Sequence, residues 1–132
     1  MSYLLDTNAC IHFLNGAHPG LIKKVLAHGP QALVVSTLSV AELEYGATRS
    51  SRPKANKARI EALLSELHVE PFTQAHAAMF GRVKADLVKR GARIADFDIA
   101  IAATALVLGL AVISDDADMG RVRGLSVENW CR

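Results

Sequence analysis

The sequence predicts an α/β fold with a parallel sheet that is covered by helices on both faces. Short apolar runs alternate with longer helical segments along the chain, and this alternation is typical of βαβ units. The length of 132 residues suits one domain with a single core. Because 51% of the residues are hydrophobic but only 5% are aromatic, we expect this core to be aliphatic.

The expected strands are short and apolar. They cover residues 3–5, 32–35, 69–72, 111–114 and 125–127, and the last is expected at an edge of the sheet. The first expected helix runs from residue 9 to a stop at Asn15-Gly16, and the others cover residues 21–27, 40–48, 54–67, 73–89 and 98–108. Either Ser36 or Ser39 can cap the third helix, and Pro53 suits the start of the fourth.

The composition also excludes several classes of protein. No apolar run is long enough to span a membrane and the N-terminus lacks a signal-peptide layout, so we expect a cytoplasmic protein with no membrane partner. Cys10 and Cys131 are too few and too far apart for a metal motif or a disulfide framework, and both are expected to be reduced. The histidines have no zinc-enzyme spacing, and neither a Gly-x-Ser-x-Gly elbow nor a phosphate loop occurs.

Two basic stretches are open to two interpretations. Residues 46–60 contain five cations and no acid, and residues 82–93 contain five further cations. Such stretches can bind RNA phosphates, but they are equally typical of a solvated helix face. The net charge of +2 is too small to decide between these interpretations. The candidates for RNA contact are Arg49, Arg52, Arg82 and Arg93.

Four acids lie where expected strands end and expected helices begin. Asp6 follows the first strand, Glu42 is expected in the first turn of the helix after the second strand, Asp98 begins its helix, and Asp116 lies two residues past the fourth strand. Each acid alone is more often a helix cap or a partner of the helix dipole. In a parallel sheet, however, all these positions share one edge, so the four side chains are expected to converge.

Convergence of these four acids would require a cation. Ionised carboxylates a few ångströms apart repel one another, and some would take up protons. A hard divalent ion such as Mg²⁺ or Mn²⁺ prefers carboxylate and water oxygens and removes this repulsion. Such a site can orient a water, lower the pKa of that water and stabilise a phosphodiester transition state.

Several segments together resemble the PIN-domain ribonuclease toxins of the VapC type. They are Leu-Leu-Asp-Thr-Asn at 4–8, Ser-Val-Ala-Glu-Leu-Glu-Tyr-Gly at 39–46, Asp98 with Ile-Ala-Ala at 101–103, and Ser-x-Asp at 114–116. The resemblance extends over essentially the whole chain, including residues 124–130. It implies that residues 1–132 form a single PIN-like domain. The implied fold is a three-layer α/β/α sandwich with a central, mostly parallel sheet of four to five strands.

The same resemblance implies a function and its partners. The implied activity is a Mg²⁺- or Mn²⁺-dependent endoribonuclease toxin that cuts structured RNA, often a transfer RNA, and so inhibits translation. The implied partners are a second copy of the chain and a cognate VapB-type antitoxin whose C-terminal segment occupies the active-site groove. The acidic set of the family falls on Asp6, Glu42, Asp98 and Asp116, with Asn8 and Ser39 as supporting polar residues.

The chain departs from the family pattern at a few positions. Asp96 adds charge where many relatives have an uncharged residue, and Thr104 replaces a common histidine. Met119 is the nearest match to an aromatic that usually follows the fourth acid. This blurs the assignment between Asp115 and Asp116, and the spacing from Ser114 favours Asp116.

Two alternative functions compete with the nuclease. A haloacid-dehalogenase-like phosphatase also begins with an aspartate at a strand end, but it needs a second aspartate two positions later, where this chain has Asn8. A non-catalytic α/β module that binds a partner would use the acids only as helix caps.

Overall fold

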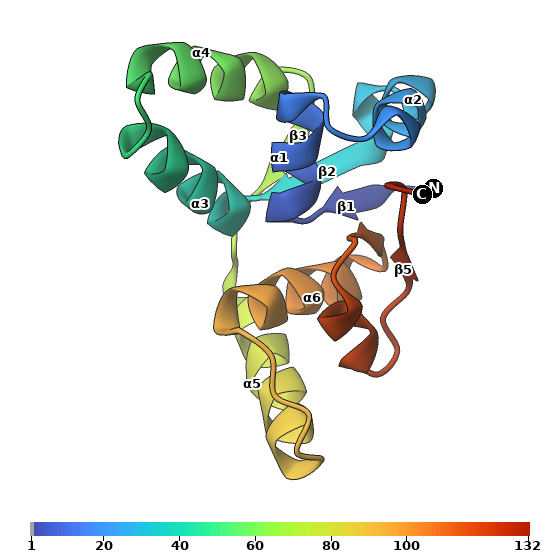
Figure 1. Cartoon of the computed structure of the whole chain (residues 1–132). Coiled ribbons are helices and arrows are strands. Elements are labelled where there is room, and N and C mark those ends of the chain that lie inside the picture. Colours follow the sequence, from blue (N-terminus) through green and yellow to red (C-terminus); the bar gives the residue numbers. More distant parts are fainter. Residues whose placement is uncertain (1) are drawn as a thin grey trace.

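A five-stranded parallel sheet between two helical layers makes up the computed structural model, which describes residues 2–132 (Figure 1). The strands are β1 (Tyr3–Leu5), β2 (Leu33–Ser36), β3 (His68–Glu70), β4 (Ala111–Ile113) and β5 (Val127–Glu128). Their order is β3-β2-β1-β4-β5, and every neighbouring pair is parallel. The predicted parallel sheet of four to five strands is therefore confirmed, with β5 at an edge as expected.

In the described part of the chain, six helices cover the two faces of this sheet. On one face lie α1 (Thr7–Asn15), α2 (Pro19–His28), α3 (Thr37–Thr48) and α4 (Pro53–Leu64), and on the other lie α5 (Gln74–Lys89) and α6 (Asp96–Leu108) (Figure 1). Two short 3₁₀ helices, η1 (Pro30–Ala32) and η2 (Ala117–Arg121), connect to the sheet. Within residues 2–132, no helix is both long and apolar enough to cross a membrane.

The central strands of the sheet are buried on both faces, so the sheet separates two mainly aliphatic cores. Successive strand residues point to opposite faces. Leu5 and Val35 therefore pack with the helices of the first face, whereas Leu4, Val34 and Val112 pack with α5 and α6. Because neither face of the central strands β2, β1 and β4 is open to water, these strands are mostly continuous apolar runs, whereas the edge strands β3 and β5 are partly exposed and contain polar residues.

Two helices begin earlier than predicted, directly after a strand. Asp6 caps α1 by accepting a hydrogen bond from the Ala9 backbone N–H at 2.7 Å, so α1 begins at Thr7 and not at residue 9. Ser36, and not Ser39, caps α3 through its hydroxyl, which accepts from the Leu38 N–H at 3.1 Å. The prediction that Glu42 lies in the first turn of its helix was therefore wrong, since the helix begins at residue 37.

The other element ends differ from prediction by a few residues. The third strand covers 68–70 and not 69–72, because proline at 71 cannot donate a ladder hydrogen bond. The last strand covers 127–128 and not 125–127, and β4 ends at Ile113, so Asp116 follows by three residues instead of two. Helix α6 begins at Asp96, which places Asp98 within its first turn and not at its start.

Candidate metal centre

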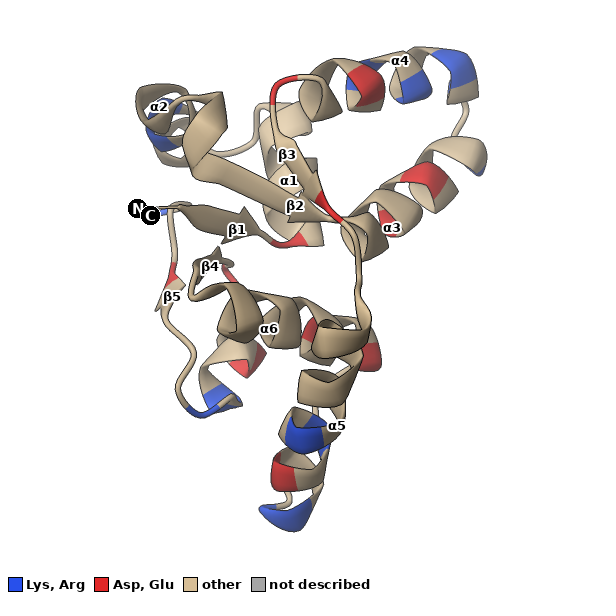
Figure 2. Ribbon diagram, turned by 180° about the vertical axis from the view of Figure 1, so that it is seen from behind, with Lys and Arg blue, Asp and Glu red and all other residues tan. Residues whose placement is uncertain are grey.

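The four acids singled out in the sequence line one hollow at the carboxyl edge of the sheet. This hollow, which we call the acidic hollow, has a volume of about 390 Å³. Its walls come from α1, α3, the start of α6 and the segment after β4, and Figure 2 shows acidic ribbon segments at the start of α1, on α3 and at the start of α6. The lining residues are Asp6, Thr7, Asn8, Ile11, Glu42, Tyr45, Gly46, Arg49, Asp98 and Asp116.

Asp6 is the most deeply buried of these acids, with 4% of its surface exposed. The pKa of its carboxyl is raised from 3.8 to about 6, mainly by burial and to a smaller extent by the charges of Asp115 and Asp98. Hydrogen bonds from Ser114 and from the Ala9 backbone act in the opposite direction. These two donors hold the carboxylate in one orientation, so the same side chain caps α1 and faces the hollow.

The pKa of Asp98 shows that the acids interact. Partial burial is the main cause that raises this pKa, and the charges of Asp116, Glu42 and Asp118 raise it as well. The carboxylate of Asp98 on α6 thus interacts electrostatically with acids on α3 and in the segment after β4. Placing a divalent cation among them would relieve this repulsion.

Glu42 is held by a hydroxyl pair that links α1 to α3. The Thr7 hydroxyl donates to Glu42 Oε1 at 2.5 Å, and Thr7 Oγ1 lies 3.0 Å from Ser39 Oγ. Ser39 is fully buried and reaches the acid only through Thr7. Thr7 is not among the site residues predicted from the sequence. Its place beside Asp6, in the first turn after a strand, is the signal that could have identified it.

The structure separates the two neighbouring acids after β4. Asp116 lines the acidic hollow and caps η2, where its Oδ1 accepts from the Asp118 N–H at 2.9 Å. Its own N–H donates to the Ser114 hydroxyl at 3.0 Å, so Ser114 supports both Asp116 and Asp6. Asp115 instead lies 3.0 Å from His12 Nε2 and does not line the hollow. In the sequence, Ser114 served only to assign Asp116 by its spacing. The structure makes it a second supporting residue.

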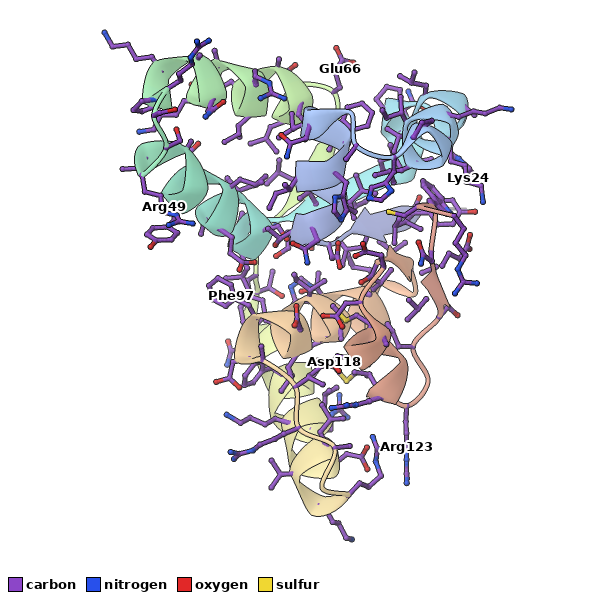
Figure 3. All side chains as sticks on the ribbon, viewed as in Figure 1. Lys24, Arg49, Glu66, Phe97, Asp118 and Arg123 are labelled. Atoms are coloured by element: carbon purple, nitrogen blue, oxygen red, sulfur yellow. The ribbon has the colours of Figure 1, made fainter. Side chains whose placement is uncertain are left out.

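Only one of the candidate RNA-binding arginines lines the hollow. Arg49 follows α3 and lies over the Tyr45 ring, with 5.5 Å between its guanidinium carbon and the ring centroid (Figure 3). Arg52, Arg82 and Arg93 are exposed and lie outside the lining.

The second basic stretch is partly neutralised within the protein. Lys84 contacts Asp96 at 3.0 Å, and Arg90 contacts Asp86 at 2.8 Å. Half-exposed surface pairs of this kind are typical of a solvated helix face.

The donors of the acidic hollow fit a hard divalent ion. Four carboxylates and the side-chain amide of Asn8 provide only oxygen ligands on a concave surface, and its lining contains neither histidine nor cysteine. Oxygen sets of this kind suit Mg²⁺ and Mn²⁺ better than softer transition metals.

Comparison with known proteins identifies the family. Residues 3–125 match the model of the PIN domain. This chain belongs to the PIN-domain family. It is 40% identical over 131 residues to Ribonuclease VapC2 of Haemophilus influenzae, with 98% of each chain covered. It is 30% identical over 132 residues to the tRNA(fMet)-specific endonuclease VapC of Salmonella typhimurium, with 99% of each chain covered.

Solved structures agree with this membership. The chain is similar to DNA-bound VapBC from Salmonella typhimurium, with a TM-score of 0.94, 28% identity and 99% of both chains covered. It is also similar to VapBC2 from Rickettsia felis bound to a promoter DNA fragment, with a TM-score of 0.89, 26% identity and 98% and 99% of the two chains covered. The predicted three-layer PIN fold and the resemblance to VapC-type ribonucleases are confirmed, and PIN nucleases in general use divalent metal ions.

Proposed function

We propose that this chain is a VapC-type toxin, an endoribonuclease that hydrolyses phosphodiester bonds in structured RNA with the help of Mg²⁺ or Mn²⁺. The observation that carries the proposal is the convergence of Asp6, Glu42, Asp98 and Asp116 on one hollow. Family membership and relatives named as ribonucleases support the same activity.

In this proposal, the four acids hold the metal. Asp6 and Asp98 are the principal ligands, because their raised pKa values mark them as the carboxyls that gain most from a nearby cation. Glu42 and Asp116 would be further ligands or would orient a water. When bound, the divalent ion lowers the pKa of a water and neutralises charge on the phosphate.

The surrounding residues keep these acids in place. Ser114 and the Ala9 N–H fix Asp6, while Thr7, supported by Ser39, fixes Glu42. Asn8 lies beside the acids with an exposed amide that would orient a water or a phosphate oxygen. Fixed ligands reduce the reorganisation needed during the reaction.

Arg49 provides the positive charge of the hollow, and we assign it to a phosphate of the RNA on either side of the cleaved bond. Arg52 follows it closely and extends the basic surface towards α4. Arg82 and Arg93 lie on and after α5, outside the hollow, and in this proposal they are at most distant contacts.

The substrate and partners follow from the relatives. One relative is named a tRNA(fMet)-specific endonuclease, so transfer RNA is the first substrate to test. Several similar structures are VapBC complexes, and we infer a VapB-type antitoxin that forms a hetero-oligomer with a homodimer of this chain. The expected place of action is the cytoplasm, because transfer RNA acts there.

Cleavage by matched variants tests the activity. Purified protein should cut transfer RNA with Mg²⁺ or Mn²⁺ and stop in EDTA. Asp98→Asn should abolish cleavage, whereas Asp86→Asn, an acid on α5 outside the hollow, should cut as the parent does. Both proteins should have the parent circular dichroism spectrum. Undiminished cleavage by folded Asp98→Asn would contradict the proposal. If the parent protein also fails to cut RNA, the non-catalytic module is favoured.

The phosphatase alternative has little support. Asn8 occupies the position where that chemistry needs a second aspartate, and the chain belongs to the PIN-domain family. Phosphate release from a generic phosphomonoester, lost in Asp6→Asn, is the result that would revive it.

A further inference from the structure

Four metal-binding side chains gather outside the acidic hollow. They are His12, His18, Asp115 and Cys131, and we call them the His/Cys cluster. Each offers one ligand atom, and these four atoms all lie within 4.8 Å of one another. None of the four residues lines the acidic hollow. They come from the last turn of α1, the cap of α2, the segment after β4 and the C-terminal tail, so folding brings them together from distant parts of the chain.

The contacts within the His/Cys cluster are close. His12 Nε2 lies 3.0 Å from Asp115 Oδ2, and the rings of His12 and His18 meet edge to face with 4.5 Å between their centroids. The two histidines and Cys131 are partly buried, whereas Asp115 is exposed. The cluster is therefore open to solvent on the aspartate side, which gives an ion a route in.

The tail that carries Cys131 is held firmly against the fold. Trp130 is buried at 2% exposure, and the Cys131 N–H donates to Asn129 Oδ1 at 2.9 Å. The tail also passes close to α2, since a Cβ atom added at Gly20 would lie 2.7 Å from the Arg132 carbonyl oxygen. Only glycine permits this approach. The thiol position is thus set by packing and does not depend on a free chain end.

We propose that the His/Cys cluster binds one Zn²⁺ ion and thereby ties the C-terminal tail to the α1–α2 connection. Two imidazole nitrogens, one thiolate and one carboxylate form a four-ligand set that suits tetrahedral Zn²⁺. The neighbouring acidic hollow has only oxygen ligands and suits a harder ion, so the chain has two sites of different chemistry. The zinc site does not rest on the nuclease proposal, and its test needs no RNA.

Cobalt binding tests this site directly. Co²⁺ replaces Zn²⁺ in tetrahedral sites and reports thiolate ligation by a charge-transfer band and visible d–d bands. The experiment uses full-length protein carrying Asp6→Asn and Asp98→Asn, which remove two acids of the hollow, in a buffer with a phosphine reductant. We expect one Co²⁺ per chain, both spectral signatures, displacement by Zn²⁺ and no displacement by millimolar Mg²⁺.

Variants of the ligands show where the ion binds. Loss of a residue that only hydrogen-bonds to a metal ligand already weakens metal binding about 10–100-fold, so loss of a ligand itself should weaken binding at least as much. Cys131→Ser should abolish the charge-transfer band, and His18→Ala should weaken binding by at least about tenfold. The matched controls are Cys10→Ala, which removes the other thiol, and His68→Ala, an exposed histidine on β3. Both controls should bind as the parent does.

Thermal unfolding provides a second readout. Zn²⁺ should raise the melting temperature of the protein, because it binds only the folded arrangement of the four segments, and Cys131→Ser should lose this increase. A cobalt complex without a thiolate band, or zinc binding that survives both Cys131→Ser and His18→Ala, would overturn the proposal. So would the absence of Zn²⁺ binding at micromolar concentration, which would leave His12 and Asp115 as a simple surface pair.

Discussion

Replacing Asp6 with asparagine should stabilise the metal-free protein at neutral pH. The carboxyl is 4% exposed and its pKa is raised from 3.8 to about 6, mainly by burial. An ionised Asp6 therefore opposes folding when no cation is bound. Asparagine is about as good a cap as aspartate, so the hydrogen bond from the Ala9 N–H at 2.7 Å can remain while the charge is removed.

The size and pH dependence follow from the pKa. A rise from 3.8 to about 6 corresponds to about 3 kcal/mol at 1.36 kcal/mol per pKa unit. The folded state binds more protons than the unfolded state between these two pKa values, so the contribution of Asp6 to stability falls as pH rises through this window. The difference between variant and parent should be absent below about pH 4 and complete above about pH 6. Because a buried amide also needs partners, we expect a net gain of about 1–3 kcal/mol at pH 7.5.

Urea unfolding in EDTA, followed by circular dichroism at several pH values, measures this difference. Asp86→Asn is a matched control of opposite sign. The hydrogen bond from Arg90, above all, lowers the pKa of Asp86, so removing the charge of Asp86 should not stabilise the fold. Adding Mg²⁺ or Mn²⁺ should stabilise the parent and leave Asp6→Asn unchanged. If Asp6→Asn is less stable than the parent at pH 7.5 without metal, the ionised carboxylate of Asp6 does not oppose folding, and its burial is not a cost that metal binding relieves.

Three further changes test the site and its frame. Thr7→Val removes the hydroxyl that holds Glu42, so it should lower the free energy of unfolding by about 1–2 kcal/mol and reduce RNA cleavage. Unchanged cleavage would show that Glu42 needs no support from Thr7. Arg49→Glu should weaken RNA binding and reduce the slope of log K against log salt by at least about one, measured by fluorescence anisotropy, whereas Arg82→Glu should change both much less. Gly109 follows α6 at φ 69°, a conformation that alanine adopts only with strain. Gly109→Ala should therefore lower the free energy of unfolding by about 1 kcal/mol, measured with denaturant, and leave RNA cleavage unchanged.

Patterns that act over a few residues could be recognised from the sequence. Continuous apolar runs between helical segments predicted the parallel sheet, because strands buried on both faces cannot carry polar alternation. The acids at strand ends predicted one shared edge, since parallel strands all finish on the same side. This geometry places residues as distant as Asp6 and Asp98 in one site from the sequence alone, although their catalytic roles stay a prediction.

The sequence could not decide between neighbouring residues that suit the same role. Both Ser36 and Ser39 satisfy the sequence rule for a cap, and only the end of β2 decides that Ser36 is used. The same limit applied to Asp115 and Asp116. Their spacing favoured Asp116, and the structure places Asp116 on the hollow and Asp115 beside His12.

The sequence by itself determined the fold class, the order of its elements and the acidic edge, because all three follow from local periodicity and from the geometry common to parallel sheets. Only the tertiary structure decided which side chains touch. It placed Thr7 against Glu42, and it brought Cys131 to His12 and His18, although the two cysteines have no metal spacing along the chain. The contacts of Cys131 depend on how the tail after β5 packs against α2, and the positions of residues along the sequence do not reveal that packing.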